Sequence, residues 1–441
     1  MQITDRFTNT FKCFKIFLCL GAMACMADIQ AQTTTSHSPY SQFGLGQMRE
    51  DLLPQNRAMG GISTGLRFQS GLATFNPANP ASYSAFSHTI LEAGLYGNMT
   101  QLAKGATTDN TADFAFSHIA IGIPLAKAGG LAFGLLPYSD VGYNTSQNVT
   151  LDTLQYRKST TGEGGLNKAF VGYGVNPIKG LSLGANVGLL FGNLADFSSI
   201  EFPYTLGAYN TRLEDSRLIR GVIVDYGAQY SMSLGNRTNL TIGYSGSLNN
   251  VVSSKATTVV SRSQASLDPD FENIPLDTIL FQESPSRDIN LPLKHNVGFT
   301  LSKGYNWMVG ADFKYADWTD FQTRPGEPLL GKNYGFALGG QFKPDATSFR
   351  YWNIVDYRLG FRYNKTQVQF NNQDINDMAI TVGVGLPLPE TNFGRTFSRV
   401  NLSAEFGQQG SLNNNLVRER YININLGFTI NDSWFLRRSL D

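Results

Sequence analysis

A repeated period-two alternation of apolar and polar residues constrains the fold of this chain more than any other feature. In 181–189 the odd positions are Leu, Leu, Ala, Val and Leu, and in 421–430 the even positions are Ile, Ile, Leu, Phe and Ile. Successive side chains of a strand point to opposite faces, so each run has one apolar and one polar face. The runs last about 9–11 residues, the length that crosses a bilayer at a tilt. The pattern predicts an all-β chain, a transmembrane antiparallel β-barrel.

The number and spacing of these segments support a barrel of about 14 strands, an even number as in bacterial barrels. The segments begin near residues 88, 115, 129, 166, 181, 221, 237, 293, 306, 333, 354, 377, 398 and 420. Short connections rich in Gly and Asn, such as 176–180 and 234–236, alternate with long ones, such as 140–165, 193–220 and 251–292. Outer-membrane barrels have short periplasmic turns and long external loops, so both chain ends are expected in the periplasm.

The first residues read as an export signal. Lys12 and Lys15 precede the apolar run 16–27, and Ala31 offers a small residue at a cleavage site. This order predicts a secretory signal peptide over 1–31. The three cysteines of the sequence all lie inside it, at Cys13, Cys19 and Cys25. We therefore expect a mature chain without disulfides, thiolate catalysis or cysteine metal sites.

The stretch Asn56–Ala85 lies between this signal and the strands, and it is dense in Gly, Ala, Ser, Asn and Pro. A barrel of about 14 strands is too wide for its own side chains to fill. We therefore predict a compact plug in the lumen; an irregular N-terminal linker is the alternative. The residues expected to form the plug are Gly60, Gly61, Asn76, Pro77 and Ala78. The predicted organisation is a signal peptide (1–31), an N-terminal extension and plug (32–87), a barrel (88–430) and a periplasmic tail (431–441).

Charge and histidine content argue against several function classes. The net charge of +1 gives no support for a nucleic-acid partner. No histidine pair has metal-ligand spacing, and we expect no metal, no cofactor and no catalytic residues. An outer-membrane enzyme is the remaining catalytic hypothesis, and it would need a nucleophile within hydrogen-bond reach of a base.

Several motifs resemble the FadL-like family of outer-membrane transporters. Ala58–Gly61 followed by Asn76–Ala78 is similar to the N-terminal hatch of that family, and Asp317–Phe321 is similar to its Trp-Ser-x-Phe motif, with Thr319 in place of Ser. Two further similar segments are Arg358–Tyr363 and Gly383–Pro387. The resemblance implies a plugged barrel of the bacterial outer membrane that carries long-chain fatty acids or aromatic hydrocarbons.

The opening segment Ser38–Gly46 departs from the fatty-acid transporter pattern. It is similar to barrels of Bacteroidetes, including a group that serves as shuttle and scaffold in a secretion system. Two functions therefore remain open. The first is uptake of a hydrophobic small molecule through a plugged lumen and a lateral opening. The alternative is a non-transporting scaffold or shuttle barrel in an outer-membrane secretion or assembly complex.

The resemblance also suggests site residues. Members of the family open sideways at a kink in the third strand, and Pro137 falls in that strand here. Proline cannot donate to a β-ladder, so Pro137 is the candidate lateral gate, unless it marks the strand's outer end. Lys314, Arg358 and Arg362 fall on the lumen-facing register. They could bind a cargo carboxylate or belong to a network of paired charges. The expected partners are outer-membrane lipid, a hydrophobic small-molecule ligand and, for a scaffold, another outer-membrane protein.

Overall fold

A computed structural model describes residues 38–152, 154–202, 208–264, 275–322, 330–370, 373–389 and 396–433. The predicted signal peptide and most of the predicted periplasmic tail lie outside these residues. Among the helices of the described part, none is both long and apolar enough to cross a membrane.

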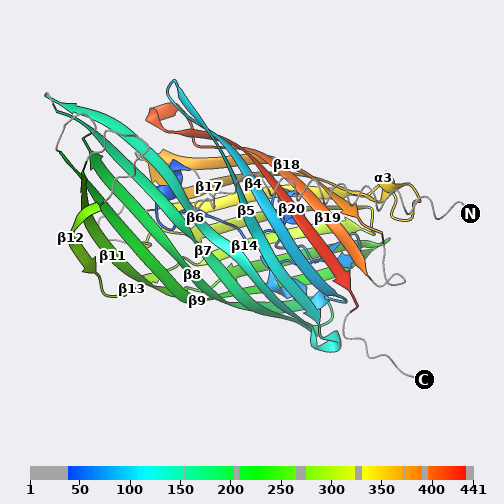
Figure 1. Ribbon diagram of the computed structural model, residues 1–441. Coiled ribbons are helices and arrows are strands. Elements are labelled where there is room, and N and C mark those ends of the chain that lie inside the picture. Colours follow the sequence, from blue (N-terminus) through cyan, green and yellow to red (C-terminus); the bar gives the residue numbers. More distant parts are fainter. Residues whose placement is uncertain are drawn as a thin grey trace, which may run out of the picture.

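The chain forms an antiparallel β-barrel (Figure 1). Of the 18 strands in its main sheet, four (β1, β11, β12 and β13) lie outside the ring, and the other 14 form it. The barrel strands are β4 (Thr89–Lys104), β5 (Thr107–Pro124), β6 (Gly130–Leu151), β7 (Leu154–Ile178), β8 (Leu181–Glu201), β9 (Tyr209–Gly235), β10 (Thr238–Ser247), β14 (Lys294–Lys303), β15 (Trp307–Asp317), β16 (Lys332–Phe342), β17 (Asp356–Phe370), β18 (Gln373–Pro387), β19 (Phe397–Gln409) and β20 (Arg418–Asp432). The ring closes where β20 pairs with β4. The predicted fold class, a barrel of about 14 strands with an N-terminal plug, is confirmed.

The two faces of the wall follow the predicted alternation. On β8, Leu183, Val187 and Leu189 are exposed on the outer face, whereas Ser182 and Asn186 are buried on the inner face. An apolar outer face suits hydrocarbon, and a polar inner face suits a lumen. The end of the barrel with the short turns is called the periplasmic end below, and the end with the long hairpins the external end.

Several strands are longer than the sequence predicts. Strands β5, β7 and β9 begin at Thr107, Leu154 and Tyr209, ahead of the predicted starts near 115, 166 and 221. The segment 251–292 contains three strands, β11 (Val251–Gln264), β12 (Pro275–Glu283) and β13 (Arg287–Asn290), instead of one loop. Beyond the bilayer the outer face of a hairpin meets water instead of hydrocarbon, so the apolar alternation that identifies a membrane strand is lost there.

The N-terminal part of the described chain lies inside the barrel, where Figure 1 shows it in blue. We call Ser38–Gly46 the mouth segment and 47–87 the plug. Their short elements are η1 (Pro39–Gln42), β1 (Gln47–Met48), α2 (Pro54–Arg57), β2 (Phe68–Gln69), β3 (Leu72–Ala73) and η2 (Pro80–Ala85). Three more short helices lie in connections of the wall: η3 (Ala126–Ala128), α3 (Tyr351–Ile354) and η4 (Asn413–Asn415).

Candidate functional site

The backbone of the plug lies in direct contact with the backbone on the inner face of the wall. A Cβ atom on Gly339 of β16 would lie 2.1 Å from the carbonyl oxygen of Met59, and one on Gly360 of β17 would lie 2.1 Å from the amide nitrogen of Gly60. Only glycine permits so close an approach. The amide of Gly60 also donates to the hydroxyl of Thr381 on β18 over 2.8 Å. The plug is therefore seated directly on three adjacent strands.

Asp312 of β15 is a second attachment point. One oxygen of its carboxylate accepts hydrogen bonds from the amides of Ser63 and Thr64, at 2.7 and 2.8 Å. The same oxygen accepts from both of their hydroxyl groups, at 3.3 and 2.9 Å. The side chain of Asp312 is 1% exposed. Loss of this acceptor would leave two buried amides unsatisfied, so Asp312 fixes the plug to the wall.

The predicted plug residues all lie inside the barrel. Gly60 and Gly61 form the tight turn after α2, with φ of +70° and +88°. The side-chain amide of Asn76 donates to the backbone carbonyls of Ser63 and Leu66, which ties two parts of the plug together. The carbonyl of Pro77 accepts from Asn186 of β8, and its neighbour Ala78 lines the cavity above the plug.

The mouth segment lies across the external end of the lumen and contacts several strands of the wall. Ser38 donates to Glu419 of β20 over 2.6 Å, and the Ser41 hydroxyl contacts both backbone groups of Gly142 on β6. Leu45 packs in an apolar cluster. That cluster includes Tyr138, Leu166, Trp318, Phe321 and Leu330. Tyr40 packs in a second cluster with Val368, Ile375 and Leu416. The external end is therefore filled by the chain's own apolar side chains.

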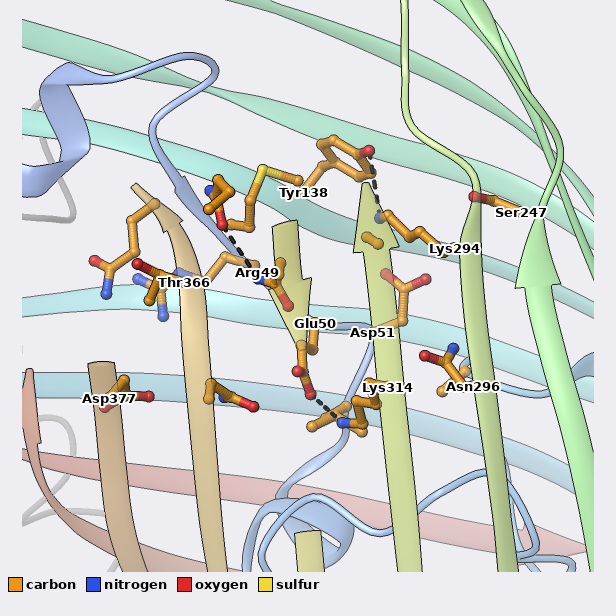
Figure 2. Close-up of a pocket in the computed structure, with 18 of the residues that line it drawn as sticks. Arg49, Glu50, Asp51, Tyr138, Ser247, Lys294, Asn296, Lys314, Thr366 and Asp377 are labelled. Atoms are coloured by element: carbon orange, nitrogen blue, oxygen red, sulfur yellow. Dashed lines mark hydrogen bonds and ion pairs between the residues drawn. The ribbon is translucent and has the colours of Figure 1, made fainter. Parts of the chain in front are cut away.

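Between the mouth segment and the plug lies a cavity of about 270 Å³ (Figure 2). Charged side chains from plug and wall meet in it: Lys314 of β15 pairs with Glu50 at 2.5 Å. Lys168 of β7 pairs with Asp51 of the plug and with Asp225 of β9. Burial disfavours the charge on Glu50, but the nearby cations Lys314, Arg362 and Arg57 together outweigh it and hold the pKa of Glu50 below its ordinary value. The cavity is therefore lined by paired ions as well as by apolar side chains such as Leu52, Ile223 and Trp318.

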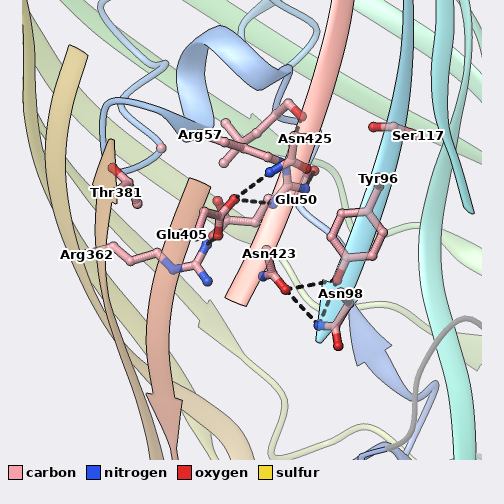
Figure 3. Close-up of polar contacts among 12 residues, drawn as sticks. Glu50, Arg57, Tyr96, Asn98, Ser117, Arg362, Thr381, Glu405, Asn423 and Asn425 are labelled. Atoms are coloured by element: carbon pink, nitrogen blue, oxygen red, sulfur yellow. Dashed lines mark hydrogen bonds and ion pairs between the residues drawn. The ribbon is translucent and has the colours of Figure 1, made fainter. Parts of the chain in front are cut away.

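The three residues predicted to bind a cargo carboxylate already have carboxylate partners within the chain. Lys314 is paired with Glu50, as described above. Arg358 pairs with Asp356 at 3.4 Å and also donates to Gln341 and Asn401. Arg362 pairs with Glu405 at 2.9 Å and with Asp377 at 3.5 Å. Figure 3 shows Arg362 beside Glu405. The carboxylate of Glu405 also pairs with Arg57 of the plug and accepts a hydrogen bond from Asn425. These contacts favour the paired-charge interpretation.

The wall is interrupted between β5 and β6, next to Pro137. Ladder pairing joins Ile119–Pro124 of β5 to Gly130–Leu135 of β6 and stops there within the described chain. Strand β6 continues along β7, with a bulge at Tyr138 between Pro137 and Ser139. A bulge bends its strand, and beyond it the buried side chains of β6 point into the lumen.

The N-terminal residues take the place of β5 along the diverted part of β6. Strand β1 pairs with β6 through Gln47–Asp140 and Met48–Ser139. The amide of Arg49 donates to the carbonyl of Tyr138 over 2.9 Å. The guanidinium of Arg49 also pairs with Asp140 at 2.5 Å. The plug therefore satisfies the edge of β6 that β5 has left.

A cavity of about 340 Å³ lies at this interruption. Its lining comes from both sides of the wall and from the plug. The lining residues are Arg49, Arg57, Tyr96, Ala115, Phe116, Ser117, Pro137, Asp140, Gly164, Gly165, Asn167 and Asn425. Pro137 thus lies beside the interruption in the wall, and both polar and apolar groups line the cavity there.

Sequence reasoning finds the lumen-facing charges but misses their partners in the plug. Asp312 lies on the predicted inner register, yet nothing in the sequence indicates that it receives Ser63 and Thr64. Glu50, Asp51 and Arg49 lie in an irregular segment without periodicity, so no pattern could assign them to a wall residue. In the described residues, no group of three or more His, Cys, Asp or Glu side chains could hold a metal ion.

Comparison with solved structures places the fold among FadL-type barrels. The chain is similar to the toluene transporter TbuX of Ralstonia pickettii, with 14% identity and a TM-score of 0.55 over 87% of this chain and 99% of that one. It is similar to a FadL homologue of Pseudomonas aeruginosa, with 11% identity and a TM-score of 0.55 over 88% and 100%. It is also similar to the toluene transporter TodX of Pseudomonas putida, with 17% identity and a TM-score of 0.52 over 88% and 99%.

These TM-scores show a shared fold. No curated protein matches the sequence. A family model described as BamG matches residues 13–441, nearly the whole chain. The chain therefore belongs to the BamG family.

Proposed function

We propose that this protein is a non-transporting scaffold barrel of the bacterial outer membrane, which holds other proteins in a membrane complex. The observation that carries the proposal is the packing of the mouth segment across the external end of the lumen. Ser38–Gly46 fills it with apolar side chains and bonds to β6 and β20. A route for hydrophobic cargo would need a continuous apolar cavity from the external loops inward.

The chemistry below the mouth segment supports the same function. Pockets for apolar ligands are lined mainly by hydrophobic side chains. Here the cavity holds Lys314–Glu50 and Lys168–Asp51 ion pairs. Passage of an apolar molecule would separate or desolvate these charges, which is costly.

The fixed plug is the third support. Its backbone rests on Gly339 and Gly360, and Asp312 holds it by hydrogen bonds to Ser63 and Thr64. A plug attached at these points acts as an internal support for the wall. In this function the outer surface and the external hairpins bind partners.

A deletion strain tests the absence of transport. Cells that lack the protein and cells that make it are supplied with a labelled long-chain fatty acid and, separately, with labelled toluene. A scaffold leaves both uptake rates unchanged. A several-fold loss of uptake of either compound on deletion would overturn the proposal.

Uptake of a hydrophobic small molecule is the second candidate function, and the wall interruption beside Pro137 favours it. The solved structures named as toluene transporters share this fold. In this function cargo would leave sideways between β5 and β6 into outer-membrane lipid, through the cavity of about 340 Å³.

The second candidate is tested with Pro137→Ala, because an added N–H group lets β6 extend its ladder. Pro177→Ala, at the exposed periplasmic end of β7, is the control. If transport uses the interruption, uptake falls in Pro137→Ala only. Equal uptake by both variants and by the unaltered protein would remove the lateral route.

A further inference from the structure

Beside the wall interruption, one edge of β5 has no strand partner in the described chain. Strand β4 pairs with β5 from Ile90–Gly122 to Lys104–Thr107, with a bulge at Ser117 between His118 and Phe116. On the other side the ladder with β6 stops at Ile119 within the described chain. The edge from Phe114 to His118 therefore faces the interruption instead of a strand.

The two edges at the interruption are not equivalent. The edge of β6 is covered by Met48, Arg49 and Ser41, as described above. The plug offers no such cover to β5. In Figure 1 the β4–β5 hairpin diverges from the β6–β7 hairpin toward the external end. The plug therefore closes one side of the interruption and leaves the other available.

The unpaired edge of β5 lies at the depth of the apolar band, where its backbone groups would meet hydrocarbon. Phe114 and Phe116 lie on the outer face of β5, in line with Ile119, and belong to the apolar band. They are 70% and 50% exposed. An unpaired backbone group in hydrocarbon costs several kcal/mol. Sheet edges are also templates for pairing with a further strand.

The space beside this edge fits the inner side chains of an added strand. The cavity of about 340 Å³ lies directly inside Ala115, Phe116 and Ser117. The residues that β6 and β7 contribute to its lining are small or polar, apart from Pro137: Asp140, Gly164, Gly165 and Asn167. A strand seated here would place apolar side chains outward beside Phe114 and Phe116, and small or polar side chains inward.

We propose that the free edge of β5 at Phe114–His118 is a docking site for one β-strand of a membrane-embedded partner protein. The partner strand alternates apolar and polar residues, and it pairs with β5 by main-chain hydrogen bonds. This inference rests on the proposed scaffold function and names the surface through which the scaffold holds its partner.

The test uses a photo-crosslinking phenylalanine analogue at Phe114 or at Phe116 of the full chain, in native outer membranes. Phe313, which is 50% exposed on the outer face of β15, is the matched control position. Mass spectrometry identifies each crosslinked protein and the crosslinked residue. A paired strand gives adducts with one partner protein at both positions, and the crosslinked partner residue shifts by two when the probe moves from 114 to 116.

Three results would overturn the docking site. They are lipid adducts alone at both positions, adducts with β6 of the same chain, and adducts with a second copy of this chain. A partner captured only at Phe313 would overturn it as well, while the scaffold function itself would stand. Loss of every protein adduct together with the absence of any co-purifying protein would overturn both.

Discussion

At the scale of single residues, the attachment of the plug depends on a few buried groups. Asp312 satisfies two backbone amides, those of Ser63 and Thr64, in a place that water does not reach. Gly339 and Gly360 provide the surface on which Met59 and Gly60 rest. An unsatisfied buried donor costs about 1–3 kcal/mol, so such residues govern whether the plug stays in place.

The first prediction concerns Asp312→Ala. The change leaves two buried amides without their acceptor, so the free energy of opening of the plug falls by about 3 kcal/mol, or roughly 100-fold in local exchange rate. Hydrogen exchange of residues 60–66, followed by mass spectrometry, measures the effect. Asp277→Ala is the control, because its ion pair with Arg262 is exposed and worth little. Equal exchange in the two variants would show that Asp312 does not hold the plug.

At the scale of elements, the central feature is the replacement of β5 by β1 along the bent part of β6. Gly46 precedes β1 with a φ of +91°, and a Cβ atom there would lie 2.4 Å from the carbonyl oxygen of Asp140. No other residue type could bring the chain into this position without moving one of the two backbones. The bulge at Tyr138 and the turn at Gly46 together place the two segments side by side.

The second prediction is that Gly46→Ala detaches β1 from β6. Gly61→Ala is the control, because Gly61 has a similar φ of +88° but its nearest neighbour is the side chain of Leu52, at 3.0 Å. Both variants carry the strain of an alanine at positive φ, roughly 1–2 kcal/mol. Only Gly46→Ala also meets backbone. Amide exchange over 138–142 should rise at least about tenfold more in Gly46→Ala than in Gly61→Ala. A similar rise in both would mean that Gly46 contributes only its own backbone strain.

Individual strands show which parts of the fold the sequence predicts and which it does not. The alternation in β8 and β20 identifies membrane strands, because hydrocarbon on one face and a polar lumen on the other impose it. Pro137 is identified because proline interrupts a ladder wherever it occurs. The pairing of Gln47 with Asp140 cannot be predicted from the sequence, because the two segments are far apart in the chain and their ladder is only two residue pairs long. The external parts of β7 and β9 are missed because their polar residues, as in 154–161 and 209–217, break the apolar alternation.

At the scale of the whole molecule, the barrel holds its own N-terminal segment in the lumen and bears long hairpins at one end. Hairpin β6–β7 turns at Leu151 and Leu154, and β8 and β9 are similarly long. The short turns gather at the other end, as between β5 and β6 at Ala126–Ala128. This asymmetry sets the orientation of the barrel in the outer membrane.

The third prediction tests that orientation with single cysteines, because the three natural ones all fall within the predicted signal peptide. Ala106→Cys lies in the exposed turn between β4 and β5, and Lys127→Cys lies in the exposed turn between β5 and β6. A membrane-impermeant maleimide should label Ala106→Cys in intact cells, and Lys127→Cys only after the outer membrane is permeabilised. The reverse labelling pattern would show that the barrel has the opposite orientation in the membrane.

Purification of the tagged protein from its native outer membrane in mild detergent tests the scaffold function most directly. Quantitative mass spectrometry then measures the ratio of each co-purifying protein to this chain and any small molecule retained in the lumen. We expect at least one other outer-membrane protein in a fixed ratio and no hydrophobic molecule inside the barrel. The isolated protein alone, with a fatty acid or an aromatic hydrocarbon bound in its lumen, would contradict the scaffold function.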